Sequence, residues 1–223
     1  MREDSFIARE PEPERMDLAD EAAAYAETDF SDVNGAFVAR LCDLEKRERL
    51  LVADLGAGPG DMAWRMAKER PGWHIVAVDV AWAMLAYAHN LFAGLAVPVY
   101  LAQADAKRLP FHGLAFDVVC ANSILHHVTD PGAHWAEVRR ILKPGGLVFM
   151  RDLRRLPARE DAQRIVATYA ADASDLLREE FYRSLLAAYT AQEVRAQLAA
   201  AKLGSLRVVN SSDRHLDVFG RLP

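Results

Sequence analysis

The chain has 223 residues, of which 52% are hydrophobic and 26% charged, and its formal net charge is −5. These values are typical of a globular protein with one sizeable core. No run of about 18 apolar residues occurs, which excludes a membrane span, and the negative charge argues against a general nucleic-acid binder.

The cysteines and the N-terminus indicate where the protein works. Residues 1–16 are acidic and polar and lack the apolar core of a signal peptide. Cys42 and Cys120 are the only cysteines, and no C-x-x-C spacing occurs. We therefore expect two reduced thiols, no cysteine-based zinc site and a cytoplasmic location without membrane contact. No particular oligomeric state is predicted.

Residues 1–49 are predicted to form an N-terminal arm and a helical cap. They carry 14 acidic and 7 basic side chains. The charged segment 1–16 is predicted to be extended or mobile, and residues 17–47 to form two helices. The second helix is "SDVNGAFVARLCDL", whose apolar residues recur at the spacing of one helical face.

From Leu50 onward, short apolar strands alternate with helical segments. Because the strands are apolar throughout, they indicate a parallel sheet covered on both faces. The expected strands are 50–55, 74–80, 97–102, 116–123 and 147–153, and the expected helices are 63–70, 81–93 and 132–142.

After this alternation, residues 158–202 are predicted to be helical with one break near 189–190. Thr190 and Glu193 have the spacing of a capping box, so a helix should begin there. Two closing strands, 206–211 and 215–220, should follow. A local cluster of basic residues is expected to be a solvated helix start or a site for an anionic substrate; it comprises Arg151, Arg154, Arg155 and Arg159.

A glycine-rich turn, "GAGPG" at residues 56–60, directly follows the first of these strands. Glycine permits the tight turn and a close approach to a ligand, and the next helix offers free N–H groups. The spacing is not the G-x-G-x-x-G of dinucleotide sites, and Asp61 suits a cationic ligand better than a pyrophosphate. Asp79, at the end of the second strand, is placed to accept hydrogen bonds from ribose hydroxyls.

Five segments in order resemble the signatures of class I S-adenosylmethionine-dependent methyltransferases. They are "VADLGAGPGD", "IVAVDVAWAML", "QADAKRLPF", "FDVVCANSILHHVTDP" and "ILKPGG", and together they cover about residues 50–151. The resemblance implies a Rossmann-like three-layer α/β sandwich with a seven-stranded, mostly parallel sheet whose last strand is antiparallel. This core would span residues 50–223, with a helical lid inserted at about 156–189.

The resemblance also implies a site for S-adenosylmethionine, which leaves as S-adenosylhomocysteine. The methionine end would be held by Asp54 and the turn, and its amino group would face Asn122. Asp79 would bind the ribose. The whole implied set is Asp54, Gly56, Ala57, Gly58, Gly60, Asp79, Val80, Met84, Asp105, Ala106 and Asn122. Asp54 and Asp105 have an alternative interpretation as residues that only stabilise turns.

His126 and His127 follow the fourth strand, where ligands bind in open α/β sheets. In a helix, neighbouring side chains point about 100° apart, so we do not expect both to face one target. One is a candidate general base or substrate contact; the alternative is packing at a helix start. No metal is expected, since His134 and Asp130 are not at a recognised ligand spacing.

The remaining acceptor-side candidates lie on three segments. Arg151 and Asp152 end the fifth strand, where they are expected to form an ion pair at the rim or to contact substrate, with Asp152 a candidate base. Tyr182 belongs to an aromatic stripe that forms either core or substrate pocket. Tyr25, with Phe30, could contribute from the N-terminal helices.

The leading hypothesis is methyl transfer to a small molecule by in-line displacement on the sulfonium. A tRNA or other nucleic-acid methyltransferase is the first alternative, disfavoured because "NSIL" stands where base-modifying enzymes carry an "NPPY"-type sequence. A non-catalytic donor-binding module is the second. A nicotinamide oxidoreductase is the third, disfavoured by the glycine spacing.

Overall fold

The computed structural model describes residues 6–12, 28 and 30–223. Seven strands form one sheet in the order β3-β2-β1-β4-β5-β7-β6. The neighbours from β3 to β5 are parallel, and β7 runs antiparallel to both β5 and β6. The strands are β1 Leu50–Leu55, β2 Trp73–Asp79, β3 Val99–Gln103, β4 Phe116–Asn122, β5 Leu142–Leu153, β6 Arg207–Asn210 and β7 His215–Arg221. This confirms the predicted Rossmann-like sheet with its last strand antiparallel.

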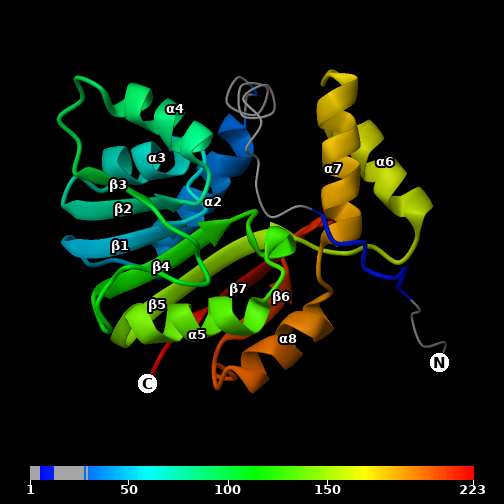
Figure 1. Ribbon diagram of the computed structural model, residues 1–223. Helices are drawn as coiled ribbons and strands as arrows, with labels where there is room; N and C mark the ends of the chain where they lie inside the picture. Colours follow the sequence, from blue (N-terminus) through cyan, green and yellow to red (C-terminus); the bar gives the residue numbers. More distant parts are fainter. Residues whose placement is uncertain (1–5, 13–27, 29) are drawn as a thin grey trace.

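Helices cover the sheet from both sides, which completes the three-layer sandwich (Figure 1). Three of them pack on one face: α2 Ser31–Leu44, α3 Asp61–Glu69 and α4 Trp82–Phe92. Two others, α5 Pro131–Ile141 and α8 Ala191–Ala200, pack on the opposite face. The predicted helix 31–44 is confirmed, whereas the helix predicted before it lies outside the described residues.

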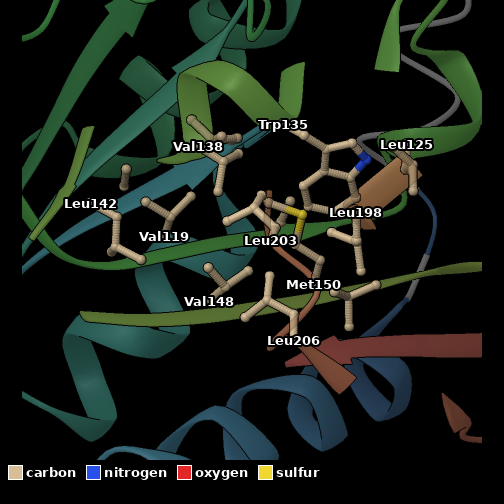
Figure 2. Close-up of a cluster of buried hydrophobic side chains, with 14 of the residues drawn as sticks. Val119, Leu125, Trp135, Val138, Leu142, Val148, Met150, Leu198, Leu203 and Leu206 are labelled. Carbon is tan, nitrogen blue, oxygen red and sulfur yellow. The ribbon is translucent and has the colours of Figure 1, made fainter. Parts of the chain in front are cut away.

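Two apolar cores explain why the strands are apolar at successive positions. Val118 and Val119 are neighbours on β4, yet Val118 packs with α2 and α3 while Val119 packs with α5 and α8. Successive side chains of a strand point to opposite faces, so a sheet covered twice needs apolar residues at both. Figure 2 shows the second core, in which Trp135 of α5 is fully buried beside Met150 and Leu198.

The region predicted as one helix up to residue 189 contains an additional break. It forms α6 Arg159–Tyr169 and α7 Asp175–Ala187, and residues 170–174 between them are not helical. Ser174 ends the gap by accepting a hydrogen bond from the Leu177 N–H, an N-cap that the prediction overlooked. The capping box at Thr190 and Glu193 is confirmed, and it begins α8.

The two helices α6 and α7 share a small core of their own beyond the sheet. The N-terminal segment 6–12 lies extended against them: the Ile7 N–H donates to Pro157 O and the Glu10 N–H to Leu186 O. The Arg9 side chain donates to Ala187 O at 2.6 Å. Within the described part of the chain, no helix is long and apolar enough to cross a membrane.

Candidate functional site

A cavity of about 1020 Å³ opens at the carboxyl ends of the parallel strands. This is the edge at which open α/β sheets bind their ligands. One half of the cavity is lined by eight residues of the predicted cofactor set: Gly56, Gly58, Asp79, Val80, Met84, Asp105, Ala106 and Asn122. The other three, Asp54, Ala57 and Gly60, do not line it.

The glycine turn needs glycine for two different reasons. Gly56, Gly58 and Gly60 all have positive φ, at 70°, 54° and 89°. A Cβ at Gly56 would lie 2.8 Å from Ile124, and one at Gly60 would lie 2.9 Å from Ala88. At Gly58, which lines the cavity, a Cβ would meet nothing within 4 Å. The outer glycines therefore allow close packing, and the central one leaves the cavity open.

Asp79 holds this turn in place. Its Oδ2 accepts a hydrogen bond from the Gly58 N–H at 2.8 Å, and its Oδ1 accepts one from the Ala81 N–H at 2.9 Å. A carboxylate has about four acceptor positions, so one Asp79 side chain could hold the turn and also accept hydrogen bonds from ligand hydroxyls. Asp79 thus stabilises the turn and also lines the cavity, as a residue that contacts the ribose would have to do.

Asp54 is a buried acid beneath the cavity, with 1% exposure. Its Oδ2 has no hydrogen-bond partner among the described residues, and Oδ1 meets only the Cys120 thiol, at 3.8 Å. Burial raises the pKa of Asp54 to about 7; the nearby Asp79 charge adds to the rise and Cys120 opposes it. A buried carboxylate whose Oδ2 atom has no partner among the described residues suits a nearby cationic group, because a positive charge would offset the cost of burying the negative one.

Asn122 continues into a polar chain that sequence reasoning missed. Its Nδ2 donates to Asn34 Oδ1 at 3.5 Å, and Asn34 Nδ2 donates to Asp61 Oδ2 at 2.8 Å. Asp61 also pairs with Arg65, so the expectation that its charge serves a cationic ligand is not supported. Asn34 had a visible signal: it stands on the apolar face of α2 with Phe37, Val38 and Leu41.

Asp105 fits both of its predicted interpretations. Its Oδ1 accepts the Lys107 N–H at 2.8 Å and pairs with the Lys107 ammonium at 3.0 Å, which stabilises the turn. It also lines the cavity beside Ala106.

The other half of the cavity is built from segments that carry no recognisable motif. Phe30, Phe181, residues 168–174 and the start of β7 at Arg214 and His215 line it. Arg214 stacks on the Tyr169 ring with its guanidinium carbon 3.3 Å from the centroid. These residues come from loops and helix ends, so their meeting depends on the tertiary fold.

Three predicted acceptor contacts are not placed at this wall. Tyr182, next to Phe181, packs in the α6–α7 core instead. Arg151 pairs with Asp217 at 2.7 Å and not with Asp152, so the expected Arg151–Asp152 pair is wrong. Successive residues of β5 point to opposite faces, which separates the two side chains. Tyr25 lies outside the described residues.

His126 and His127 occupy the 3₁₀ turn η1 (Leu125–His127) and both line the cavity. Their rings lie 4.1 Å apart, and both approach the Glu12 Oε1 atom: His126 Nε2 at 3.5 Å and His127 Nδ1 at 3.3 Å. The expectation that the two cannot face one target is therefore wrong. Their common contact, Glu12, belongs to the N-terminal arm, so the spacing of the two histidines in the sequence could not predict it.

Asp152 lies behind His126, out of the cavity. Its Oδ1 is 2.5 Å from His126 Nδ1, and its Oδ2 accepts the Leu125 N–H at 2.5 Å. Burial alone would lower the pKa of His126, but Asp152 and Glu12 outweigh it and the pKa is raised. Burial would raise the pKa of Asp152, yet His126 and the Leu125 N–H lower it. Asp152 therefore orients His126 instead of meeting a ligand.

His134, the other histidine considered near this turn, is separate from it. It is fully buried, and burial lowers its pKa to about 4. Its Nδ1 lies 3.4 Å from Ala106 O, so it supports the cavity wall from behind.

Comparisons with known proteins agree with this geometry. Residues 52–146 match the family described as a methyltransferase domain. The chain is 33% identical over 143 residues to the ubiquinone biosynthesis O-methyltransferase of Hahella chejuensis, covering 59% of this chain and 56% of that protein. It is 31% identical over 162 residues to the malonyl-[acyl-carrier protein] O-methyltransferase of Geobacter sulfurreducens, covering 73% and 58%. The matched part thus spans about half the length of these relatives.

Solved structures share the fold at low sequence identity. A putative S-adenosylmethionine-dependent methyltransferase of Methanococcus maripaludis superposes with a TM-score of 0.74 at 18% identity, covering 96% of this chain and 98% of that one. The [4+2]-cyclase SpnF superposes with a TM-score of 0.65 at 16% identity, covering 97% and 99%. Likeness at this level shows the fold alone, which carries both kinds of chemistry.

Proposed function

Because the chain belongs to the class I S-adenosylmethionine-dependent methyltransferases, we propose that it transfers a methyl group from this donor to a small-molecule acceptor. The observation that carries the proposal is the cavity wall: an open glycine turn, Asp79 and Asn122 stand together above the buried acid Asp54. The donor has no phosphate but carries an ammonium and a sulfonium, so acids and an amide oxygen suit it.

The donor would lie along the carboxyl ends of β1, β2 and β4. Asp79 would accept hydrogen bonds from the ribose hydroxyls, and Val80 and Met84 would border the adenine. Asp105 and the Ala106 backbone would meet its edge. Asn122 would face the amino group, with Asp54 supplying negative charge from below. When bound, the donor supplies an activated methyl group, and the chain has to align the acceptor and exclude water.

The acceptor would occupy the half of the cavity between η1 and the α6–α7 segment. Phe30 and Phe181 offer apolar contacts, and Arg214 and His127 offer polar ones. We propose that α6 and α7 act as the lid. His127 is the better candidate than His126 for a substrate contact or base, because the Nδ1 atom of His126 is committed to Asp152. The relatives are named for both O- and C-methylation, so the acceptor atom is left open.

The basic cluster was the main observation in favour of a nucleic-acid acceptor, and the structure gives these arginines partners within the chain. All four arginines of the basic cluster bond within the chain: Arg151 to Asp217, Arg154 to Asp213 O, Arg155 to Glu193 and Arg159 to Glu10. We therefore propose a small-molecule acceptor, a cytoplasmic location and a donor-binding core of residues 50–223.

One experiment separates the enzyme from its alternatives. Calorimetry should show that S-adenosylhomocysteine binds and that NAD does not; tighter binding of NAD would refute the proposal. A metabolite extract incubated with the protein and donor carrying a labelled methyl group should yield a labelled small product. Donor binding without any labelled product would favour the binding module, and label in bulk tRNA would favour nucleic acid.

Replacement of Asp54 by asparagine should stabilise the donor-free protein but weaken donor binding. An acid whose folded pKa of about 7 exceeds its unfolded value of about 3.9 opposes folding increasingly as the pH rises between them. Removing that charge should raise the free energy of unfolding at pH 8 by about 1–3 kcal/mol, with the gain vanishing near pH 4. Urea titrations at both pH values check this.

The same variant should bind S-adenosylhomocysteine about tenfold or more weakly, because it removes the buried negative charge proposed to attract the ammonium group; a tenfold loss corresponds to about 1.4 kcal/mol. If the variant and the wild type had equal stability at pH 8 and equal affinity, the Asp54 charge would neither destabilise the fold nor contribute to donor binding.

A further inference from the structure

Glu12, His126 and His127 bring three potential metal ligands to one point. Their nearest nitrogen and oxygen atoms all lie within 4.8 Å of one another, the one such group of acidic, histidine or cysteine side chains in the described ranges. Glu12 Oε1 is 3.3 Å from His127 Nδ1 and 3.5 Å from His126 Nε2. Ligands about 2.1 Å from a shared tetrahedral ion lie about 3.4 Å apart, so both spacings are within about 0.1 Å of this value.

The surrounding contacts orient the ligand atoms. His126 Nδ1 is engaged by Asp152, which directs its Nε2 at Glu12. Metal-binding histidines characteristically use their second nitrogen in this way, with a carboxylate that fixes the ring. Ser184 of α7 donates to Glu12 Oε1 at 2.9 Å, which fixes the third ligand.

The local charge also accommodates a cation. With neutral imidazoles, the two carboxylates of Glu12 and Asp152 exceed the single charge of Arg9 by one negative unit. The Arg9 guanidinium donates to Ala187 O and His126 O and lies over the Tyr189 ring. The Glu12 side chain is mostly buried, so a positive charge beside it would offset its loss of hydration.

From this geometry we propose that Glu12, His126 and His127 bind one divalent transition-metal ion, of which Zn²⁺ is the best fit. Two imidazoles and one carboxylate suit Zn²⁺ and its first-row neighbours, whereas Mg²⁺ and Ca²⁺ prefer oxygen ligands. Three protein ligands leave at least one coordination position for water or a ligand oxygen. His126, His127 and Ser184 line the cavity, so that position adjoins the proposed acceptor half.

The site also joins separate parts of the fold. Glu12 comes from the arm, the two histidines follow β4, and Ser184 belongs to α7. A bound ion would therefore fasten the arm and the α6–α7 helices to the sheet.

Calorimetry with Zn²⁺ on chelator-treated full-length protein tests the proposal, with Co²⁺ absorption as a report on the ligands. The wild type should bind one Zn²⁺ per chain and no Mg²⁺. Glu12→Gln and His127→Ala should each weaken Zn²⁺ binding at least tenfold and abolish the visible Co²⁺ bands. Asp152→Asn should weaken it about 10–100-fold. The matched control is His112→Ala, which changes an exposed histidine outside the cavity lining and should bind Zn²⁺ as the wild type does.

Absence of Zn²⁺ binding by the wild type would overturn the proposal, as would equal binding by wild type, Glu12→Gln and His127→Ala. Thermal unfolding in chelator shows that each variant is folded, and Glu12→Gln preserves the side-chain shape. The site rests on its own geometry, not on the proposed methyl transfer. S-adenosylhomocysteine binding is measured on the same samples. Loss of Zn²⁺ binding alone would refute the metal site, and absence of S-adenosylhomocysteine binding alone would refute the methyl-transfer proposal.

Discussion

Asp79→Ala is expected to weaken S-adenosylhomocysteine binding about a hundredfold or more. The variant would lose the proposed hydrogen-bond acceptor for the ribose hydroxyls, and it would also leave the Gly58 and Ala81 N–H groups without the carboxylate that they bind at 2.8 and 2.9 Å. Hydrogen bonds to a charged group contribute about 1.5–3 kcal/mol each, so losing two already gives this factor. Calorimetry at constant pH measures it.

A comparison with Asp79→Asn separates the two roles of the side chain. Asparagine retains one acceptor oxygen, so it should keep part of the turn and bind between the wild type and the alanine variant. The control is Asp43→Asn, which alters an exposed pair with Lys46 and should leave binding unchanged. Affinity of Asp79→Ala within about threefold of the wild type would remove Asp79 from the donor site.

Asp152→Ala is expected to lower the free energy of unfolding by about 3–5 kcal/mol. Asp152 is buried, at 3% exposure, and it pairs with His126, which is equally buried. Removing one partner leaves the other without compensation, and the Leu125 N–H also loses its acceptor. Urea unfolding at pH 6 measures the loss.

The pH dependence of that loss follows from the two pKa shifts. His126 has a raised pKa, so its contribution is complete below about pH 6.5 and is lost as the pH rises through the folded value. Asp152 has a lowered pKa, so its contribution is present above about pH 3.9 and is lost as the pH falls through the folded value. The effect of Asp152→Ala should therefore be largest between about pH 4 and 6.5.

Two variants control this experiment. Asp43→Ala breaks an exposed pair and should cost under about 1 kcal/mol. The double variant Asp152→Ala with His126→Ala should cost less than the two single losses combined, since neither charge is left unpaired. A loss below about 1 kcal/mol for Asp152→Ala would mean that the pair does not stabilise the fold.

The half of the cavity that we propose for the donor was predictable because its sequence signals are local. A buried strand, a glycine turn and a helix start follow one another within a dozen residues, and Asp79 ends the next strand in the same way. Parallel strands bring their carboxyl ends to one edge, so separate local predictions meet without knowledge of packing. The capping box of Thr190 and Glu193 was predictable for the same reason.

The half that we propose for the acceptor was not predictable, because its residues come together only in the folded chain. Glu12 reaches the two histidines from the far end of the chain, and Phe181 lines the cavity while Tyr182 beside it does not. Which of these aromatic neighbours lines the cavity depends on how α7 packs against the rest of the fold. The partner of Arg151 depended on the register of β5 with β7.

The buried thiol of Cys120 beside Asp54 makes the centre of the sheet observable by chemical labelling. Cys120 is fully buried and burial raises its pKa, so the native protein shields it, whereas Cys42 on α2 is partly exposed. A thiol reagent should modify Cys42 first and reach Cys120 only when β1 and β4 open. In a Cys42→Ser variant, the rate of Cys120 labelling would measure how often these strands separate. A ligand that binds in the cavity and stabilises the closed form should lower this rate.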